Sequence, residues 1–161
     1  MRLYLKQKVF TWKDKGTVMD EWGNDKYYIE GKVFSIGKKL WIRDVNGTEL
    51  AYLRQKVPSL LPRFFVEIGG EEKAAVSKKL TLFKPKYIVE GPGWDVTGDV
   101  FGHDYTVCAG ETPVITVHKK WMSWGDAYEL DIGYGADELL ALAVTLAIDA
   151  VLDAQSNNAS S

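Results

Sequence analysis

Hydrophobic and polar residues alternate along most of this chain, and the alternation returns as one repeating unit. Its six copies align on charged reference positions spaced 24, 24, 23, 20 and 21 residues apart: Lys8, Lys32, Lys56, Lys79, Asp99 and Lys120. Five and three residues before each reference, and one residue after it, the side chain is apolar or aromatic, while two residues before it the side chain is polar. Because a period of two is typical of a strand with one buried face, each copy predicts a β-strand with inward apolar residues.

Each unit also leaves room for a second strand before a tight turn into the next unit. Asn46-Gly47, Gly69-Gly70 and Gly91-Pro92-Gly93 supply the positive φ angles that hairpin turns need. Successive hairpins of one period predict an antiparallel meander. The predicted strands cover residues 2–10, 17–21, 26–34, 39–44, 49–57, 63–68, 73–81, 86–90, 94–101, 104–109, 113–121 and 127–132, which makes twelve.

Residues 137–153 carry the one strong helical pattern, with Asp137 as the expected N-cap. In the 14 positions that follow Glu138, only Thr145 and Asp149 are polar, and a helix that is apolar all round is buried on every side or lies in lipid. A membrane span needs about 20 apolar residues, so the pattern favours a buried core helix, with a membrane tail anchor as the alternative. The side chains expected inside are Leu139, Leu140, Leu142, Val144, Leu146, Ile148 and Val151.

Strands and helix together predict a mainly β fold, in which six hairpins form a closed 12-stranded antiparallel barrel around the C-terminal helix. Side chains alone fill a barrel of about 8 strands, whereas a wider barrel leaves a lumen. A helix about 10 Å across fits such a lumen. We expect a single domain at residues 1–153, followed by a disordered polar tail at 154–161.

Three segments resemble the LURP-one-related family, especially its small bacterial members. They are YYIEGKVFS at 27–35, KKWMSWGD at 119–126 and DELLALA at 137–143, and the similarity extends over residues 1–153. This family belongs to the Tubby C-terminal-like superfamily, which also includes the phospholipid scramblases. The resemblance implies a 12-stranded barrel around a hydrophobic C-terminal helix, but little biochemistry. Tubby domains bind phosphoinositides through basic side chains, whose positions have no residue-by-residue match here.

The net charge of −2 is unevenly distributed between the two ends of the predicted barrel. In a meander, the segments 8–15, 32–39, 56–63, 78–86, 99–104 and 119–126 lie at one end. They hold 14 of the 20 Lys and Arg and only four of the 22 Asp and Glu, so this end carries +10 and the remainder −12. Lysines interleaved with Trp, Phe and Leu are typical of a protein that binds an anionic membrane surface. The candidate lipid-binding rim comprises Lys13, Lys15, Lys38, Lys39, Arg63, Lys84, Lys86, Lys119, Lys120, Trp12, Leu60, Phe83 and Trp124.

We therefore expect a non-enzymatic peripheral binding module for anionic phospholipid or phosphoinositide headgroups. Other interpretations stay open. Lysines beside strands also keep a barrel in solution, with the loop apolar residues folded over the barrel mouth, and the domain is then a soluble scaffold, a protein-interaction domain or a holder of an apolar ligand. Nucleic acid is disfavoured as a partner because the chain has no recognition helix or RNA-binding motif, and no protein partner is indicated.

Candidate chemistry for catalysis or metal binding is sparse. His103, Asp104 and Cys108 lie close in sequence and suggest a thiol dyad, but Cys108 falls in the middle of a predicted strand, where a small buried thiol is the usual explanation. Two His and one Cys match no zinc pattern, so we expect no catalytic residue, metal or cofactor. A single cysteine and the lack of a secretory apolar segment after Met1 predict the cytoplasm, with a peripheral place at the membrane.

Overall fold

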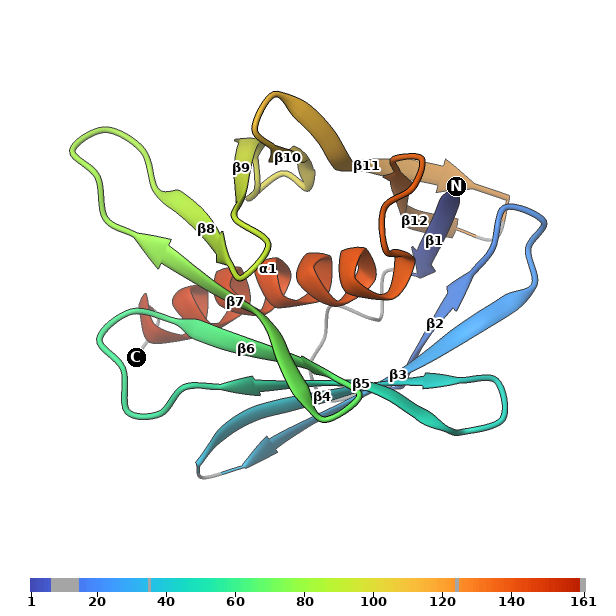
Figure 1. Cartoon of the computed structure of the whole chain (residues 1–161), viewed down its shortest axis with the longest axis horizontal. Coiled ribbons are helices and arrows are strands. Elements are labelled where there is room, and N and C mark those ends of the chain that lie inside the picture. Colours follow the sequence, from blue (N-terminus) through green and yellow to red (C-terminus); the bar gives the residue numbers. More distant parts are fainter. Residues whose placement is uncertain (7–14, 35, 124, 160–161) are drawn as a thin grey trace.

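The computed structural model describes residues 1–6, 15–34, 36–123 and 125–159, with side chains up to residue 155. Twelve antiparallel strands close into a barrel, and one helix follows them, which confirms the predicted fold (Figure 1). The strands are β1 (Arg2–Lys6), β2 (Lys15–Met19), β3 (Asp25–Phe34), β4 (Gly37–Asp44), β5 (Glu49–Gln55), β6 (Arg63–Ile68), β7 (Glu71–Lys79), β8 (Lys86–Glu90), β9 (Trp94–Asp99), β10 (Asp104–Ala109), β11 (Thr112–Met122) and β12 (Gly125–Ile132).

Every strand pairs with its neighbours in the chain, and β1 pairs with β12 to close the barrel. The closing register places Leu3 opposite Leu130 and Leu5 opposite Tyr128. All four of these side chains are buried. The first and last strands therefore leave no free edge in the sheet. Because the strands run up and down in sequence order, every second hairpin turn lies at the same end of the barrel.

Helix α1 (Glu138–Ala159) runs through the barrel and plugs its lumen (Figure 1). Residues 141–151 are all buried, so the wall covers the helix on every side along this stretch. Asp137 is the N-cap that the sequence predicted, since its Oδ1 accepts a hydrogen bond of 3.0 Å from the amide of Leu140. The interpretation as a buried core helix is confirmed.

A polar cluster fixes the first turn of α1 against β3. The Tyr27 hydroxyl donates a 2.5 Å hydrogen bond to Glu138, and the Lys26 ammonium lies 2.7 Å from the same carboxylate. Burial, together with this hydrogen bond, raises the pKa of the Tyr27 hydroxyl well above its usual range. The hydroxyl therefore remains a proton donor to Glu138 and holds the helix start in place.

Two details of the helix differ from the prediction. It continues to Ala159 instead of ending at Asp153, because Ala154 still packs against the core and the chain has no Gly or Pro there. Residues 154–159 of the expected disordered tail are thus helical. Leu139 and Leu140 are only half-buried, since they lie in the first turn at the barrel mouth, whereas Leu142, Val144, Leu146, Ile148 and Val151 are buried as expected.

The wall of the barrel is incomplete between β8 and β9. These strands pair at only two positions, Ile88 with Asp95 and Val89 with Trp94, whereas β7–β8 and β9–β10 each pair at five. Val96 lies three residues before its reference position, where the equivalent residues of the other units are buried. Beside this gap, Val96 is only half-buried. No helix in the described part of the chain is long and apolar enough to cross a membrane.

Candidate functional site

Large apolar side chains project into solvent at the end of the barrel where the sequence placed the basic segments. Of the 15 large hydrophobic residues that are exposed in the described chain, ten lie in these segments: Val33, Phe34, Ile36, Val57, Leu60, Leu80, Leu82, Phe83, Phe101 and Trp121. The most exposed are Leu60 at 103%, Phe83 at 95% and Leu82 at 94%. These loop residues therefore do not fold inward over the barrel mouth.

Part of this exposure corrects the interpretation of the repeat. The residue after each reference position was expected to point into the core, yet Val33, Val57, Leu80 and Trp121 are 50–80% exposed. These residues lie at or just beyond strand ends, where no core residue remains to cover them. The alternation predicts which face of a strand is apolar, but that face is buried only as far as the core extends.

Three neighbouring hairpin tips combine such apolar residues with lysines. They connect β3 to β4, β5 to β6 and β7 to β8, and they extend on the side where α1 ends (Figure 1). We call this surface the apolar–basic rim and define it as Phe34, Ile36, Lys39, Lys56, Leu60, Lys79, Leu82, Phe83, Lys84 and Lys86. A close approach fixes two of the tips together: Gly37 has a φ of 111°, and a Cβ there would lie 2.7 Å from Val57.

Several cations of the predicted rim are engaged in ion pairs. The Lys38 ammonium lies 2.5 Å from Asp153 of α1 and is only 12% exposed, so it fastens the helix to the β3–β4 tip. Arg63 pairs with Glu90 at 2.6 Å, and Lys120 pairs with Glu129 at 2.6 Å. Lys119 lies 3.8 Å from Asp126. These four side chains are less available to a ligand than the sequence suggested.

Six other lysines at this end of the barrel have no carboxylate partner among the residues that the structure describes. They are Lys15, Lys39, Lys56, Lys79, Lys84 and Lys86. Lys39 instead lies 5.1 Å from the ring of Phe34, which joins a cation and an aromatic ring at one tip. The predicted rim residues Trp12, Lys13 and Trp124 lie outside the described residues.

A partly buried polar pair joins the turn between β9 and β10 to helix α1. His103 has a φ of 55°, a left-handed conformation that histidine adopts more readily than most residues. Its Nε2 lies 2.8 Å from Asp149 of α1, and its ring packs 4.6 Å from Tyr128. Burial raises the pKa of the Asp149 carboxyl from 3.8 to about 6, although the hydrogen bond with His103 acts in the opposite direction.

Substituting Asp149 is expected to change the pH dependence of stability. Because the folded protein holds a proton on Asp149 up to about pH 6 and the unfolded chain only to about 3.8, the stability of the folded state falls as pH rises through this window. The raised pKa corresponds to about 3 kcal/mol. Asp149→Asn cannot ionise, so its free energy of unfolding should gain about that amount relative to wild type between pH 4 and 7, as measured by urea denaturation.

The same experiment has an internal control. His103→Gln removes the imidazole that lowers the Asp149 pKa, so its loss of stability should extend to higher pH than that of wild type. If the difference in free energy of unfolding between wild type and Asp149→Asn stays constant from pH 4 to 7, the raised pKa of Asp149 is contradicted.

The thiol dyad suggested by the sequence does not form. His103 contacts Asp149, while Cys108 lies near the other end of β10, opposite Asp95 and Pro113. Five residues of extended chain separate them by roughly 16 Å. Within the described residues, no three His, Cys, Asp or Glu side chains gather closely enough to hold a metal ion.

Comparison with known proteins decides the family. The LURP-one-related family model matches residues 1–149. The chain is also 38% identical over 152 residues to protein YxjI of Bacillus subtilis (strain 168), a match that covers 94% of both chains. The chain belongs to the LURP-one-related family. The resemblance seen in the sequence is thereby confirmed.

A solved structure shares the fold of this LURP-one-related domain. It is the X-ray structure of a protein from Arabidopsis thaliana, which matches with a TM-score of 0.67 and 19% identity over 93% of this chain and 90% of that one. At this identity the likeness concerns the barrel and its helix. The family barrel is consistent with a binding domain that has no catalytic role.

Sequence reasoning missed the burial of Lys78, the contact between Asp149 and His103, and the exposed Leu82. Lys78 is 7% exposed on β7, and the signal was available, because it shares the alternating face of Val76, the buried position of its repeat. The contact between His103 and Asp149 had no such signal, because the two residues are 46 positions apart in the sequence. Leu82 was missed because it lies in the loop between the two strands of its unit, outside the repeat positions.

Proposed function

We propose that this LURP-one-related domain is a peripheral binding module that places its apolar–basic rim on anionic membrane surfaces. The observation that carries the proposal is the coincidence, on three adjacent tips, of fully exposed apolar side chains with lysines that lack carboxylate partners among the described residues. Exposed apolar residues gathered in one place mark interaction surfaces. Leu60, Leu82 and Phe83 enter the headgroup region, and the lysines beside them attract anionic lipid.

The main alternative is that the lysines serve only to keep the barrel in solution. That role explains charge at strand ends, but it gives no reason for exposing ten large apolar residues at the same end. A folded-in cap over the barrel mouth would have removed them from water. Their exposure therefore favours binding to a surface that is both apolar and anionic.

Charge reversal at two rim lysines should weaken binding to anionic vesicles. Lys39 and Lys56 lie on the β3–β4 and β5–β6 tips, and each lysine near an anionic surface contributes about 1 kcal/mol. Lys39→Glu with Lys56→Glu is therefore expected to lower the partition coefficient into vesicles that contain phosphatidylserine by about 30-fold or more, because both attractions are lost and two repulsions are added. Sedimentation with vesicles at low salt measures this change.

A matched control reverses two charges at the opposite end of the barrel. Arg2→Glu with Lys73→Glu changes the net charge equally but lies away from the rim, so it should bind nearly as wild type. Equal weakening by both pairs would show that net charge alone governs binding and would refute the rim. Vesicles with phosphoinositide at matched total charge then separate headgroup recognition from general attraction.

A further inference from the structure

The gap in the wall between β8 and β9 opens into a cleft beside the apolar–basic rim. The two strands pair only near the β8–β9 turn, so they diverge toward the rim. The cleft between them has a volume of about 970 Å³. This is at the upper end of the range of about 300–1,000 Å³ that small-molecule sites occupy.

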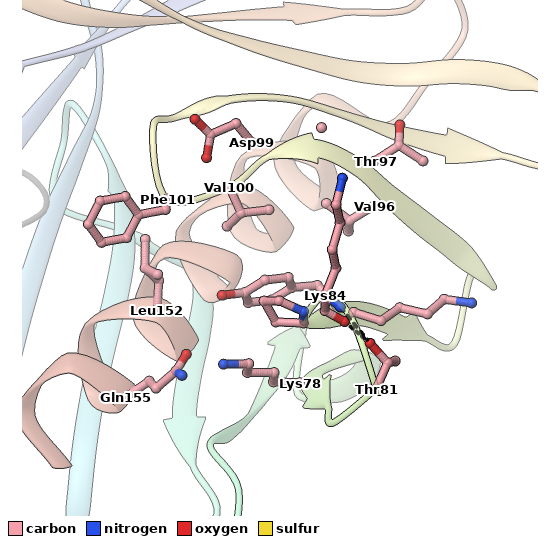
Figure 2. Close-up of a pocket in the computed structure, with 14 residues that line it drawn as sticks. Lys78, Thr81, Lys84, Val96, Thr97, Asp99, Val100, Phe101, Leu152 and Gln155 are labelled. Carbon is pink, nitrogen blue, oxygen red and sulfur yellow. Dashed lines mark hydrogen bonds between the residues drawn. The ribbon is translucent and has the colours of Figure 1, made fainter. Parts of the chain in front are cut away.

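The cleft is lined mainly by apolar side chains from the wall and from α1. Val96, Val100 and Phe101 come from β9 and the turn after it, Tyr87 comes from β8, and Leu152 comes from the helix. Figure 2 shows Phe101, Leu152 and Gln155 together on one side of the cleft, with Lys78 beside Gln155 and with Val96 and Lys84 on the other side. The cleft thus exposes a part of the core, including Leu152 of α1, between β8 and β9.

A buried cation faces this apolar space. Lys78 lies on the inward face of β7 and is only 7% exposed, yet its ammonium has no hydrogen bond or ion pair within the described part of the structure. Burial lowers the pKa of Lys78. A buried charge without a counterion is costly, so an anion that entered the cleft would gain from this position.

The remaining charges of the cleft keep the balance positive. Lys84 and Lys86 line the cleft beside Lys78, and Asp99 is its single carboxylate. The Asp99 side chain already accepts a 2.9 Å hydrogen bond from the amide of Gly102. In Figure 2 it lies at the edge of the cleft away from Lys78. The lining therefore holds three lysines and one carboxylate around a mainly apolar surface.

We propose that this cleft binds an anionic lipid, with one acyl chain along Val96, Val100 and Leu152 and the acidic headgroup at Lys78 and Lys84. The inference deepens the proposed function, because the rim that approaches the membrane also carries the mouth of the cleft at the β7–β8 tip. The barrel then binds one acyl chain of a lipid that belongs to the membrane surface on which the rim docks. An acidic peptide that pairs with the open edges of β8 and β9 is the competing occupant.

Titration calorimetry with a single-chain lipid below its micelle concentration tests the cleft apart from the rim. Palmitoyl lysophosphatidate is expected to bind wild type at one site. Glycerol phosphate lacks the chain, and palmitoyl lysophosphatidylcholine lacks the net negative charge, so both should bind at least about tenfold more weakly. Lys78→Met should weaken lysophosphatidate about tenfold without loss of folding, since it replaces a buried unpaired ammonium with an apolar side chain.

Filling the cleft provides the second arm. Val100→Trp, or the milder Val96→Phe if the first variant unfolds, should abolish lysophosphatidate binding and leave sedimentation with anionic vesicles unchanged. Leu60→Asp with Phe83→Asp should weaken sedimentation with anionic vesicles and leave lysophosphatidate binding unchanged. The two readouts therefore test the cleft and the rim separately. Equal affinity for glycerol phosphate or unchanged lysophosphatidate binding in the filled variants would overturn the proposal. So would a wild type that binds an acidic peptide but not lysophosphatidate, if the filled variants no longer bind the peptide.

Discussion

Deleting α1 is expected to abolish cooperative unfolding of the barrel. Residues 141–151 of the helix are all buried, and the inward side chains of the wall pack around them. Burying one Val, Leu or Ile contributes about 1.5–3 kcal/mol, while the net stability of a domain is only about 5–15 kcal/mol. Loss of Leu142, Val144, Leu146, Ile148 and Val151 together therefore removes about as much stabilisation as the whole net stability of a domain. Calorimetry of a chain lacking residues 137–161 should show no cooperative transition.

A point substitution gives the same test in a full-length chain. Leu146→Ala leaves a cavity between helix and wall and should lower the free energy of unfolding by about 2–5 kcal/mol. The matched control, Leu60→Ala, alters a fully exposed leucine and should change it by no more than about 0.5 kcal/mol. A truncated barrel that unfolds cooperatively at the wild-type temperature would refute the structural role of α1.

The barrel could be predicted because its determinants are local and repeated. The residue three before each reference, such as Leu5, Ile29 and Leu53, is buried in five of the six units. Period-two alternation with glycine turns specifies a meander, and an apolar helix too short for a membrane has only the lumen to occupy. Each signal can be read within one repeat unit or within the helix itself.

The part that could not be predicted depends on where the core ends and on contacts across the barrel. Val33 and Leu80 follow the inward pattern but lie past the core, so their exposure depends on the length of the plugged interior and not on any local signal. The pairing of Lys38 with Asp153 joins residues 115 positions apart. The charge of the sequence segments placed Lys38 in the predicted rim, because a count of charges along the chain does not show that Asp153 pairs with this lysine in the fold.

Removing the apolar tips is expected to have the largest effect on membrane binding. Leu60 and Phe83 are fully exposed, so moving them into the headgroup region does not disturb the packing of the barrel core. At about 1.5 kcal/mol or more for each side chain, Leu60→Asp with Phe83→Asp should lower the partition coefficient roughly 100-fold. Because neither side chain contributes to the core, the free energy of unfolding should stay near the wild-type value.

The most direct test of the membrane-binding rim compares this variant with a matched one from the other end of the barrel. Trp22 and Tyr134 are 78% and 109% exposed there, so Trp22→Asp with Tyr134→Asp makes an equivalent change in charge and apolar surface. Sedimentation with phosphatidylserine vesicles should show wild-type binding for the Trp22 and Tyr134 pair and roughly 100-fold weaker binding for the Leu60 and Phe83 pair. Equal binding by the two variants, or no binding by wild type at low salt, would contradict the account.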